Sequence, residues 1–133
     1  MSEHNEQVAL FDWARMLEGR HPQLKMMFAI PNGGKRTNGN KLVREGLKKG
    51  VPDIFLSVPM EKTVYGFGVQ DKFSIGWFHG LYIEMKFNKN KPTKEQKQWL
   101  EDLTIEGYDT AVCWSFDEAK AKIIQYLRLE TCP

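Results

Sequence analysis

Leu81-Tyr82-Ile83-Glu84-Met85-Lys86 is the stretch that decides the fold. Side chains at positions i and i+2 of a β-strand point to the same face. The apolar residues therefore share one face, and Tyr82, Glu84 and Lys86 share the other. This places a carboxylate beside an ammonium group, where the first can hold a cation and the second can face a substrate phosphate. A half-exposed strand without a function explains the same alternation, so a second element is needed to decide.

Val51-Pro52-Asp53 supplies that second element, because Asp53 stands at the start of another apolar run. A turn-capping Asp is the alternative reading of this residue. Two carboxylates on neighbouring strands repel each other and need a cation between them. Oxygen ligands of this kind suit Mg²⁺ or Mn²⁺, and the main-chain carbonyl of Met85 is a candidate third ligand. Lys86 is then expected to orient or help deprotonate the attacking water, or to offset charge in the transition state.

Two further residues are candidates for supporting this site. Gln96 lies in the first turn of a predicted helix and can reach back over Glu84 and Lys86. Its other role is to complete a capping box with Thr93. Glu6, in the first predicted helix, is a candidate outer carboxylate of the same metal site, although a single helical Glu is more often a solvated residue.

Basic residues gather in two regions around the acidic positions, and this distribution fits a phosphate-rich ligand. The turn Asn32-Gly33-Gly34-Lys35-Arg36 offers exposed amides and two cations to a DNA backbone, and Lys89 and Lys91 follow the Glu84 strand. Solvated charges on two ordinary surfaces are the alternative. The turn lacks the Gly-Lys-Ser/Thr ending of a P-loop, so a nucleotide cofactor is not expected.

The composition predicts one globular domain over residues 1–133, with 41% hydrophobic residues and a net charge of only +2. Cys113 and Cys132 lack any zinc-binding spacing. No signal peptide is recognised, and no apolar stretch approaches the roughly 20 residues that span a bilayer. A cytoplasmic protein without membrane contact is the expectation.

Hydrophobic periodicity predicts an α/β fold with a mixed sheet and helices on its faces. The expected helices cover 3–17, 40–49, 93–107 and a last segment to about 129, and the expected strands cover 26–30, 53–58, 80–87 and 110–114. Trp99, Leu100 and Leu103 are expected to face a core. Residues 59–79 form a long hairpin excursion with pairing in 63–69 and 73–78, whose aromatic residues either pack together or form a dimer surface.

Five motifs, taken together and in this order, resemble a known family. They are Ile30-Pro31-Asn32-Gly33-Gly34, Gly50-Val51-Pro52-Asp53, Gly80-Leu81-Tyr82-Ile83-Glu84-Met85-Lys86, Thr93-Lys94-Glu95-Gln96 and Gly107-Tyr108. The chain is similar in these motifs, from Glu6 to about Leu127, to the virus-type replication-repair nuclease (VRR-NUC) domain of the PD-(D/E)xK nuclease superfamily. The resemblance implies a restriction-endonuclease-like core with a mixed central β-sheet flanked by α-helices.

The resemblance also implies roles and partners. It places Asp53, Glu84 and Lys86 at the three motif positions, Gln96 at the helical Gln and Glu6 at the first-helix Glu. Stand-alone members of the family are small, often viral or bacterial, and dimeric, and they are implicated in cutting branched DNA. The chain is thus expected to be a Mg²⁺- or Mn²⁺-dependent, Holliday-junction-resolving homodimer of phage type. A flap- or nick-directed repair nuclease and a non-catalytic branched-DNA-binding module are the alternatives. The excursion is longer than a minimal hairpin, which leaves substrate choice and the dimer contact open.

Overall fold

Strands with alternating apolar residues assemble into a four-stranded mixed sheet, which confirms the expected α/β class. The computed structural model describes residues 2–31, 39–68 and 71–130. The sheet has the order β1-β2-β5-β6. Its strands are β1 (Met27–Ala29), β2 (Ile54–Leu56), β5 (Leu81–Met85) and β6 (Asp109–Cys113). β2 pairs antiparallel with β1 and β5, whereas β6 runs parallel to β5, with Glu84 opposite Val112.

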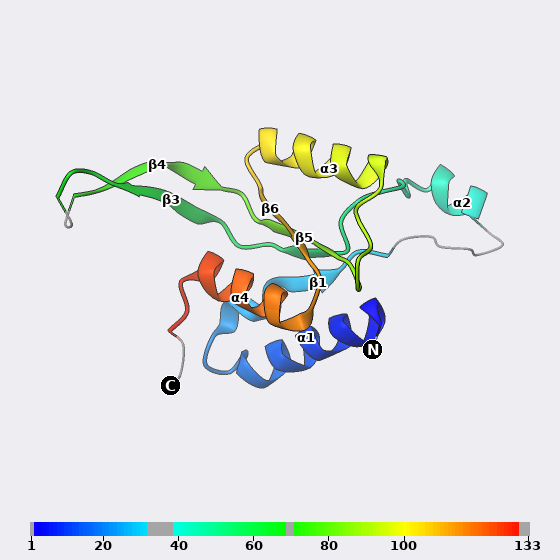
Figure 1. The fold of residues 1–133 in the computed structure, drawn as a ribbon, viewed down its shortest axis with the longest axis horizontal. Coiled ribbons are helices and arrows are strands. Elements are labelled where there is room, and N and C mark those ends of the chain that lie inside the picture. The colour runs from blue at the N-terminus through cyan, green and yellow to red at the C-terminus, as the bar shows by residue number, and fades with distance from the viewer. Residues whose placement is uncertain (1, 32–38, 69–70, 131–133) are drawn as a thin grey trace.

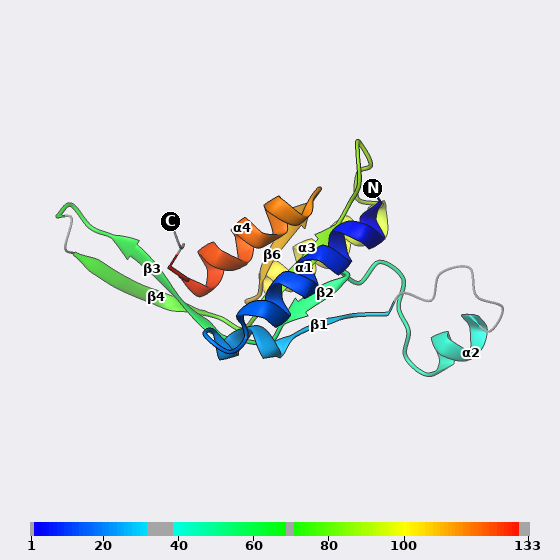
Figure 2. The ribbon, with the colours of Figure 1, turned by 90° about the horizontal axis from the view of Figure 1, so that it is seen from below.

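Helices cover both faces of this sheet (Figures 1 and 2). α1 (Glu3–Leu17) and α4 (Phe116–Leu127) lie on one face, and α3 (Lys94–Ile105) lies on the other. Each begins at a hydroxyl residue whose side chain accepts a main-chain N–H of the first turn: Ser2, Ser115 and Thr93. A 3₁₀ turn, η1 (Pro22–Met26), leads into β1, and the short α2 (Gly39–Arg44) lies apart from the sheet.

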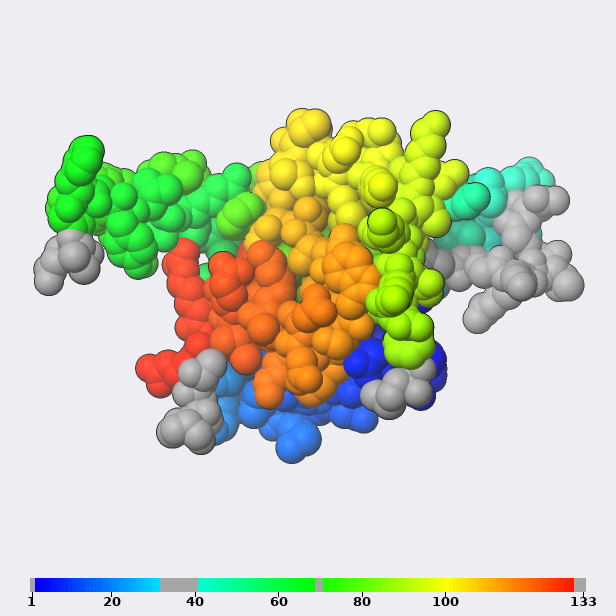
Figure 3. All heavy atoms as spheres, viewed as in Figure 1, coloured from blue at the N-terminus to red at the C-terminus, as the bar shows by residue number. Residues whose placement is uncertain are grey.

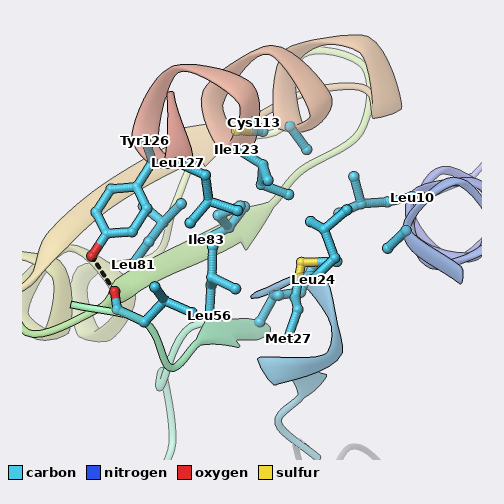
Figure 4. Close-up of a cluster of buried hydrophobic side chains, with 14 of the residues drawn as sticks. Leu10, Leu24, Met27, Leu56, Leu81, Ile83, Cys113, Ile123, Tyr126 and Leu127 are labelled. Carbon is cyan, nitrogen blue, oxygen red and sulfur yellow. Dashed lines mark hydrogen bonds between the residues drawn. The ribbon is translucent and has the colours of Figure 1, made fainter. Parts of the chain in front are cut away.

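The hydrophobic core fills the space between the sheet and the α1–α4 layer. Leu81, Ile83 and Met85 of β5 are completely buried there, as the alternation predicts. Figure 4 shows side chains of β5, α4, α1 and η1 meeting in this layer. The Tyr126 hydroxyl donates to the Val58 carbonyl at 2.6 Å, which satisfies the polar end of an otherwise apolar contact. One face of β5 is therefore committed to the core, and the other is left for a site.

Three helix predictions need correction. The predicted helix 40–49 ends at Arg44, because Gly46 (φ 111°) closes it: the Leu47 N–H donates to Leu42 and the Gly46 N–H to Val43. The last helix ends at Leu127 rather than 129, because Arg128 takes the left-handed conformation. α3 has no fully buried residue, so Trp99, Leu100 and Leu103 are only half-buried.

The predicted excursion is a separate two-stranded sheet made of β3 (Met60–Tyr65) and β4 (Lys72–Phe78). β4 agrees with the predicted segment 73–78 to within one residue, whereas β3 begins and ends several residues before the predicted segment 63–69. The hairpin projects from the body at the end opposite α2 (Figures 1 and 3). Within the described ranges, no helix is long and apolar enough to cross a membrane.

Candidate active site

The turn that precedes Asp53 is fixed on the first turn of α3. Gly50 has φ 91°, and a Cβ atom there would lie 2.8 Å from the backbone carbonyl carbon of Glu95. Only glycine tolerates both the conformation and the close approach. The Trp99 indole N–H donates to the Lys49 carbonyl at 3.1 Å. These two contacts place the turn before Asp53 beside the start of α3, although the two segments are far apart in the sequence.

Asp53 lies immediately before β2, at the edge of the sheet. Its carbonyl accepts the Ile30 N–H at 2.7 Å, and its Oδ2 accepts the Met85 N–H at 2.7 Å. The side chain therefore takes the place of a strand partner for Met85. Because the N–H and C=O of one strand residue point to the same side, the Met85 carbonyl also faces the Asp53 side of β5.

Glu84 and Lys86 share the face of β5 that looks toward α3, as the alternation predicts. Their Oε2 and Nζ atoms are 3.6 Å apart. Glu84 is 1% exposed and Lys86 is 8% exposed. The half-exposed-strand alternative is therefore wrong, since the polar face is covered as well. Burial of this pair costs free energy unless further partners compensate, and such a cost is common where side chains serve a function.

Burial raises the pKa of Glu84 to about 9; hydrogen bonding with Asp53 and the charge of Asp53 add to the rise, and Lys86 opposes it. Glu84 Oε1 is buried and has no hydrogen-bond partner among the described residues. The neighbouring carboxyl groups of Asp53 and Glu84, with one Glu84 oxygen unused and a main-chain carbonyl nearby, fit the oxygen-donor preference of Mg²⁺ or Mn²⁺. Among the described residues, no group of three or more His, Cys, Asp or Glu side chains is close enough to hold a metal.

Gln96 makes both predicted contacts, one with Thr93 and one with Glu84, and it uses a different side-chain atom for each. Its Oε1 accepts the Thr93 N–H at 2.8 Å and completes the capping box of α3. Its Nε2 donates to Glu84 Oε2 at 3.3 Å. The start of α3 is thus tied directly to the buried carboxylate, and the two interpretations of Gln96 are compatible.

Glu6 does not join Asp53 and Glu84 in a three-carboxylate cluster. Its Oε1 accepts the Phe116 N–H at 3.2 Å, at the N-terminus of α4, and its Oε2 is buried without a hydrogen-bond partner in the described structure. An acidic group at a helix N-terminus is stabilised by the helix dipole. This contact connects α1 with α4.

Lys89 and Lys91 are exposed on the segment that follows β5. Their position is suited to contacting a phosphate backbone. The Asn32-Gly33-Gly34-Lys35-Arg36 turn lies outside the described residues.

Sequence reasoning gave no role to the aromatic row beside the carboxylates. Phe55 and Tyr82 are cross-strand partners that stack with ring centroids 4.3 Å apart. Phe55 lies two residues after Asp53, and Tyr82 lies two residues before Glu84. Residues two apart share a face of the sheet, so each ring lies on the same face as its neighbouring carboxyl group. Only the strand register, which the sequence does not reveal, brings these rings together.

Comparison with known proteins agrees with this geometry. The family model of the VRR-NUC domain matches residues 4–117. A solved structure described as a VRR_NUC domain protein is 27% identical, with a TM-score of 0.71 over 97% of this chain and 90% of that chain. No curated protein matches the sequence.

Proposed function

This chain belongs to the VRR-NUC domain family, and on that premise we propose that it is a Mg²⁺- or Mn²⁺-dependent, structure-selective DNA endonuclease. Family membership implies a nuclease-type function. The finer proposal rests above all on the buried Glu84 carboxylate, whose Oε1 lacks a hydrogen-bond partner in the described structure and whose neighbours are Asp53 and Lys86. A protein that only bound DNA would gain nothing from burying paired carboxylates beside a phosphate, because they would repel it.

Asp53, Glu84 and the Met85 carbonyl are the proposed ligands of the cation. A divalent cation bound there supplies a Lewis acid that offsets charge on the phosphate and favours ionisation of water. Lys86 orients the attacking water from its place beside Glu84. Gln96 positions Glu84 through the Nε2 contact, and Glu6 supports the layer behind it.

Hydrolysis follows from in-line attack of water on phosphorus. The new bond joins the water oxygen to phosphorus, and the bond between phosphorus and the 3′-oxygen breaks. The departing oxygen takes a proton, and the water gives one up, so the products are a 3′-hydroxyl and a 5′-phosphate. Stabilising the charge that develops on the phosphate is the main requirement of this reaction.

Branched DNA is the proposed substrate, held by Lys89, Lys91 and the turn 32–36. A symmetric homodimer presents two such sites related by a two-fold axis. Four-way junctions need two paired cuts, so this arrangement suits resolution of a Holliday junction.

Cleavage of labelled four-way junction, flap and linear duplex DNA, with Mg²⁺, Mn²⁺ or EDTA, tests the proposal. The matched variants are Glu84→Gln at the site and Glu101→Gln on the exposed face of α3. Metal-dependent paired cuts on the junction, lost only in Glu84→Gln, are expected. Cuts confined to flaps or nicks would mean that the proposed substrate is wrong and that the proposed chemistry is right. Tight metal-independent binding with no cleavage would mean that the protein is a DNA-binding module and not an enzyme.

A further inference from the structure

Three aromatic rings form a row across the sheet, on the face that carries Glu84. Phe28, Phe55 and Tyr82 are successive cross-strand partners on β1, β2 and β5, so their side chains share that face. The rings of Phe55 and Tyr82 stack with centroids 4.3 Å apart, and the Phe28 ring meets the Phe55 ring edge-on at 5.7 Å. These three residues are called the ring platform below.

The ring platform lies outside the hydrophobic core. The core is on the opposite face of the sheet, where Ile54 and Ile83, which are sequence neighbours of two of these rings, are completely buried. On the platform side α3 packs chiefly against β6, at the other edge of the sheet. Phe28 is therefore left 49% exposed, and Phe55 and Tyr82 are half-buried. Large apolar side chains that lie together at a surface usually mark a contact site.

The middle of the platform is held in place by its neighbours. A Cβ atom at Gly80 would lie 2.6 Å from the Phe55 ring, so this ring rests directly on the backbone next to β5. The Tyr108 ring, which follows α3, meets the rings of Phe55 and Tyr82 edge-on with centroids 5.9 and 5.2 Å away. Side chains that are already ordered lose little conformational entropy when a ligand binds. The platform is thus ready to receive a flat, apolar group.

Strand β5 sets a ring, a carboxyl group and an ammonium group in one line. Tyr82, Glu84 and Lys86 occupy every second position, so they share a face and follow one another at steps of roughly 7 Å. The neighbouring segment repeats the first step, because Phe55 lies opposite Tyr82 and the same register brings Asp53 opposite Glu84. The two carboxyl groups therefore lie between the ring platform and Lys86.

This order matches the order of groups in a nucleotide, where a sugar separates the charged phosphate from the flat base. A phosphate at the carboxyl groups and Lys86 would have the base of its own or the adjacent nucleotide within reach of the platform. Aromatic rings bind bases by stacking, and every base has a face to offer. In a continuous duplex those faces are covered by neighbouring base pairs, so only an unpaired base is free to stack.

A protein partner fits this position less well than DNA. A protein seated on the platform would also obstruct the approach to Asp53 and Glu84, one row further along the same face. A DNA strand uses both rows at once. Phe28 and Phe55 have no hydrogen-bonding group in their side chains, so the platform would accept any of the four bases.

We propose that the ring platform is a stacking site for an unpaired nucleobase next to the phosphate that is cut. The protein would thereby select DNA whose bases are unpaired beside the cut, as in a flap, over continuous duplex. The inference rests on the proposed function for the position of the phosphate, but binding of the base requires no cleavage. Phe28, the most exposed of the three rings, is expected to make the main contact.

Fluorescence anisotropy in EDTA tests the platform by binding alone. Two labelled flap DNAs share one duplex; the single-stranded arm of the first keeps its bases, and every arm position of the second is abasic. A linear duplex is the third DNA. Phe28→Leu removes the exposed ring and keeps an apolar side chain. Phe73→Leu, at a ring that is 57% exposed on β4, is the matched control. Far-UV circular dichroism and melting temperature establish that both variants are folded.

Phe28→Leu should weaken binding of the flap with bases by about tenfold, as loss of one stacking contact does, and leave binding of the other two DNAs unchanged. Phe73→Leu should bind all three as the parent does. A parent that binds the abasic flap as tightly as the flap with bases would overturn the proposal without any variant. Equal loss of affinity for flap and duplex in Phe28→Leu would overturn it as well.

Cleavage is scored separately, so the two proposals fail independently. A parent that cuts DNA but does not distinguish the two flaps would disprove the ring platform and leave the nuclease standing. A parent that cuts no DNA, yet prefers the flap with bases through Phe28, would support the platform and contradict the nuclease.

Discussion

The carboxylate of Asp53 accepts the main-chain N–H of Met85 at 2.7 Å, so an acidic side chain continues the pairing of β5 just before β2 begins. One of its oxygens is engaged in holding the strand that carries Glu84 and Lys86. The distance between the two carboxyl groups is therefore set by main-chain geometry.

Lys86 is expected to be needed for cleavage and not for folding. Lys86→Ala should lower the cleavage rate by about 100-fold or more, because the water loses its positioning group and the phosphate loses a nearby positive charge. Single-turnover cleavage of labelled junction DNA measures this, with melting temperature as a check on the fold. Lys89→Ala, which changes an exposed residue of the next turn, should mainly weaken DNA binding. A Lys86→Ala protein that cut at the parent rate would remove Lys86 from the site.

The stability of the metal-free protein should decrease as the pH rises. Folding raises the pKa of Glu84 from 4.5 to about 9, so between these values the folded state keeps a proton that the unfolded chain has released. The free energy of unfolding therefore falls with rising pH over that window, by on the order of several kcal/mol at most. Urea unfolding in EDTA from pH 5 to pH 9 should reveal the decline.

Glu84→Gln is the variant that isolates this effect. It should unfold at nearly the same urea concentration across the window and be more stable than the parent at pH 8. Adding Mg²⁺ or Mn²⁺ should stabilise the parent most at high pH, because a ligand carboxylate must be deprotonated to bind metal. Equal pH dependence in the parent and in Glu84→Gln would mean that Glu84 does not carry the raised pKa.

The two contacts of Gln96 can be separated by a pair of variants. Thr93→Ala breaks the capping box alone and should cost about 1 kcal/mol of stability without changing cleavage by bound enzyme. Gln96→Ala removes both contacts and should lose similar stability and also cleavage rate, since Glu84 loses its amide donor. Urea unfolding and single-turnover rates give the two readouts. Equal cleavage by both variants would leave Gln96 a purely structural residue.

Gly50→Ala should disturb the site, although Gly50 is not one of the proposed site residues. The new Cβ atom would lie 2.8 Å from the backbone of Glu95 and would demand a strained φ. Gly46→Ala shares the positive φ but points into open space, so it measures the conformational cost alone, about 1 kcal/mol. Gly50→Ala should be clearly more destabilising than Gly46→Ala in urea unfolding. A similar loss in both would show that α3 shifts away without penalty.

The sequence was most informative where a local pattern determines the structure. The alternation in β5 predicted the shared face of Glu84 and Lys86, and Thr93 with Gln96 predicted the start of α3. Glycines that can end a helix look alike in sequence, so the pattern predicts a helix over 40–49, whereas Gly46 closes α2 after Arg44. The burial of Glu84 depends on how α3 packs, and the place of Glu6 depends on where α4 begins. Such long-range relationships carry no periodic signal.

β5 is at once the centre of the hydrophobic core and the carrier of Glu84 and Lys86, on alternating positions. A slip of the strand by one residue would exchange its two faces and put the charged pair into the apolar layer. Misaligned versions of the site would therefore be unstable as proteins. The strand register that builds the hydrophobic core is therefore the same register that orients Glu84 and Lys86. A chain that folds with this core also has its acidic and basic groups on the correct face.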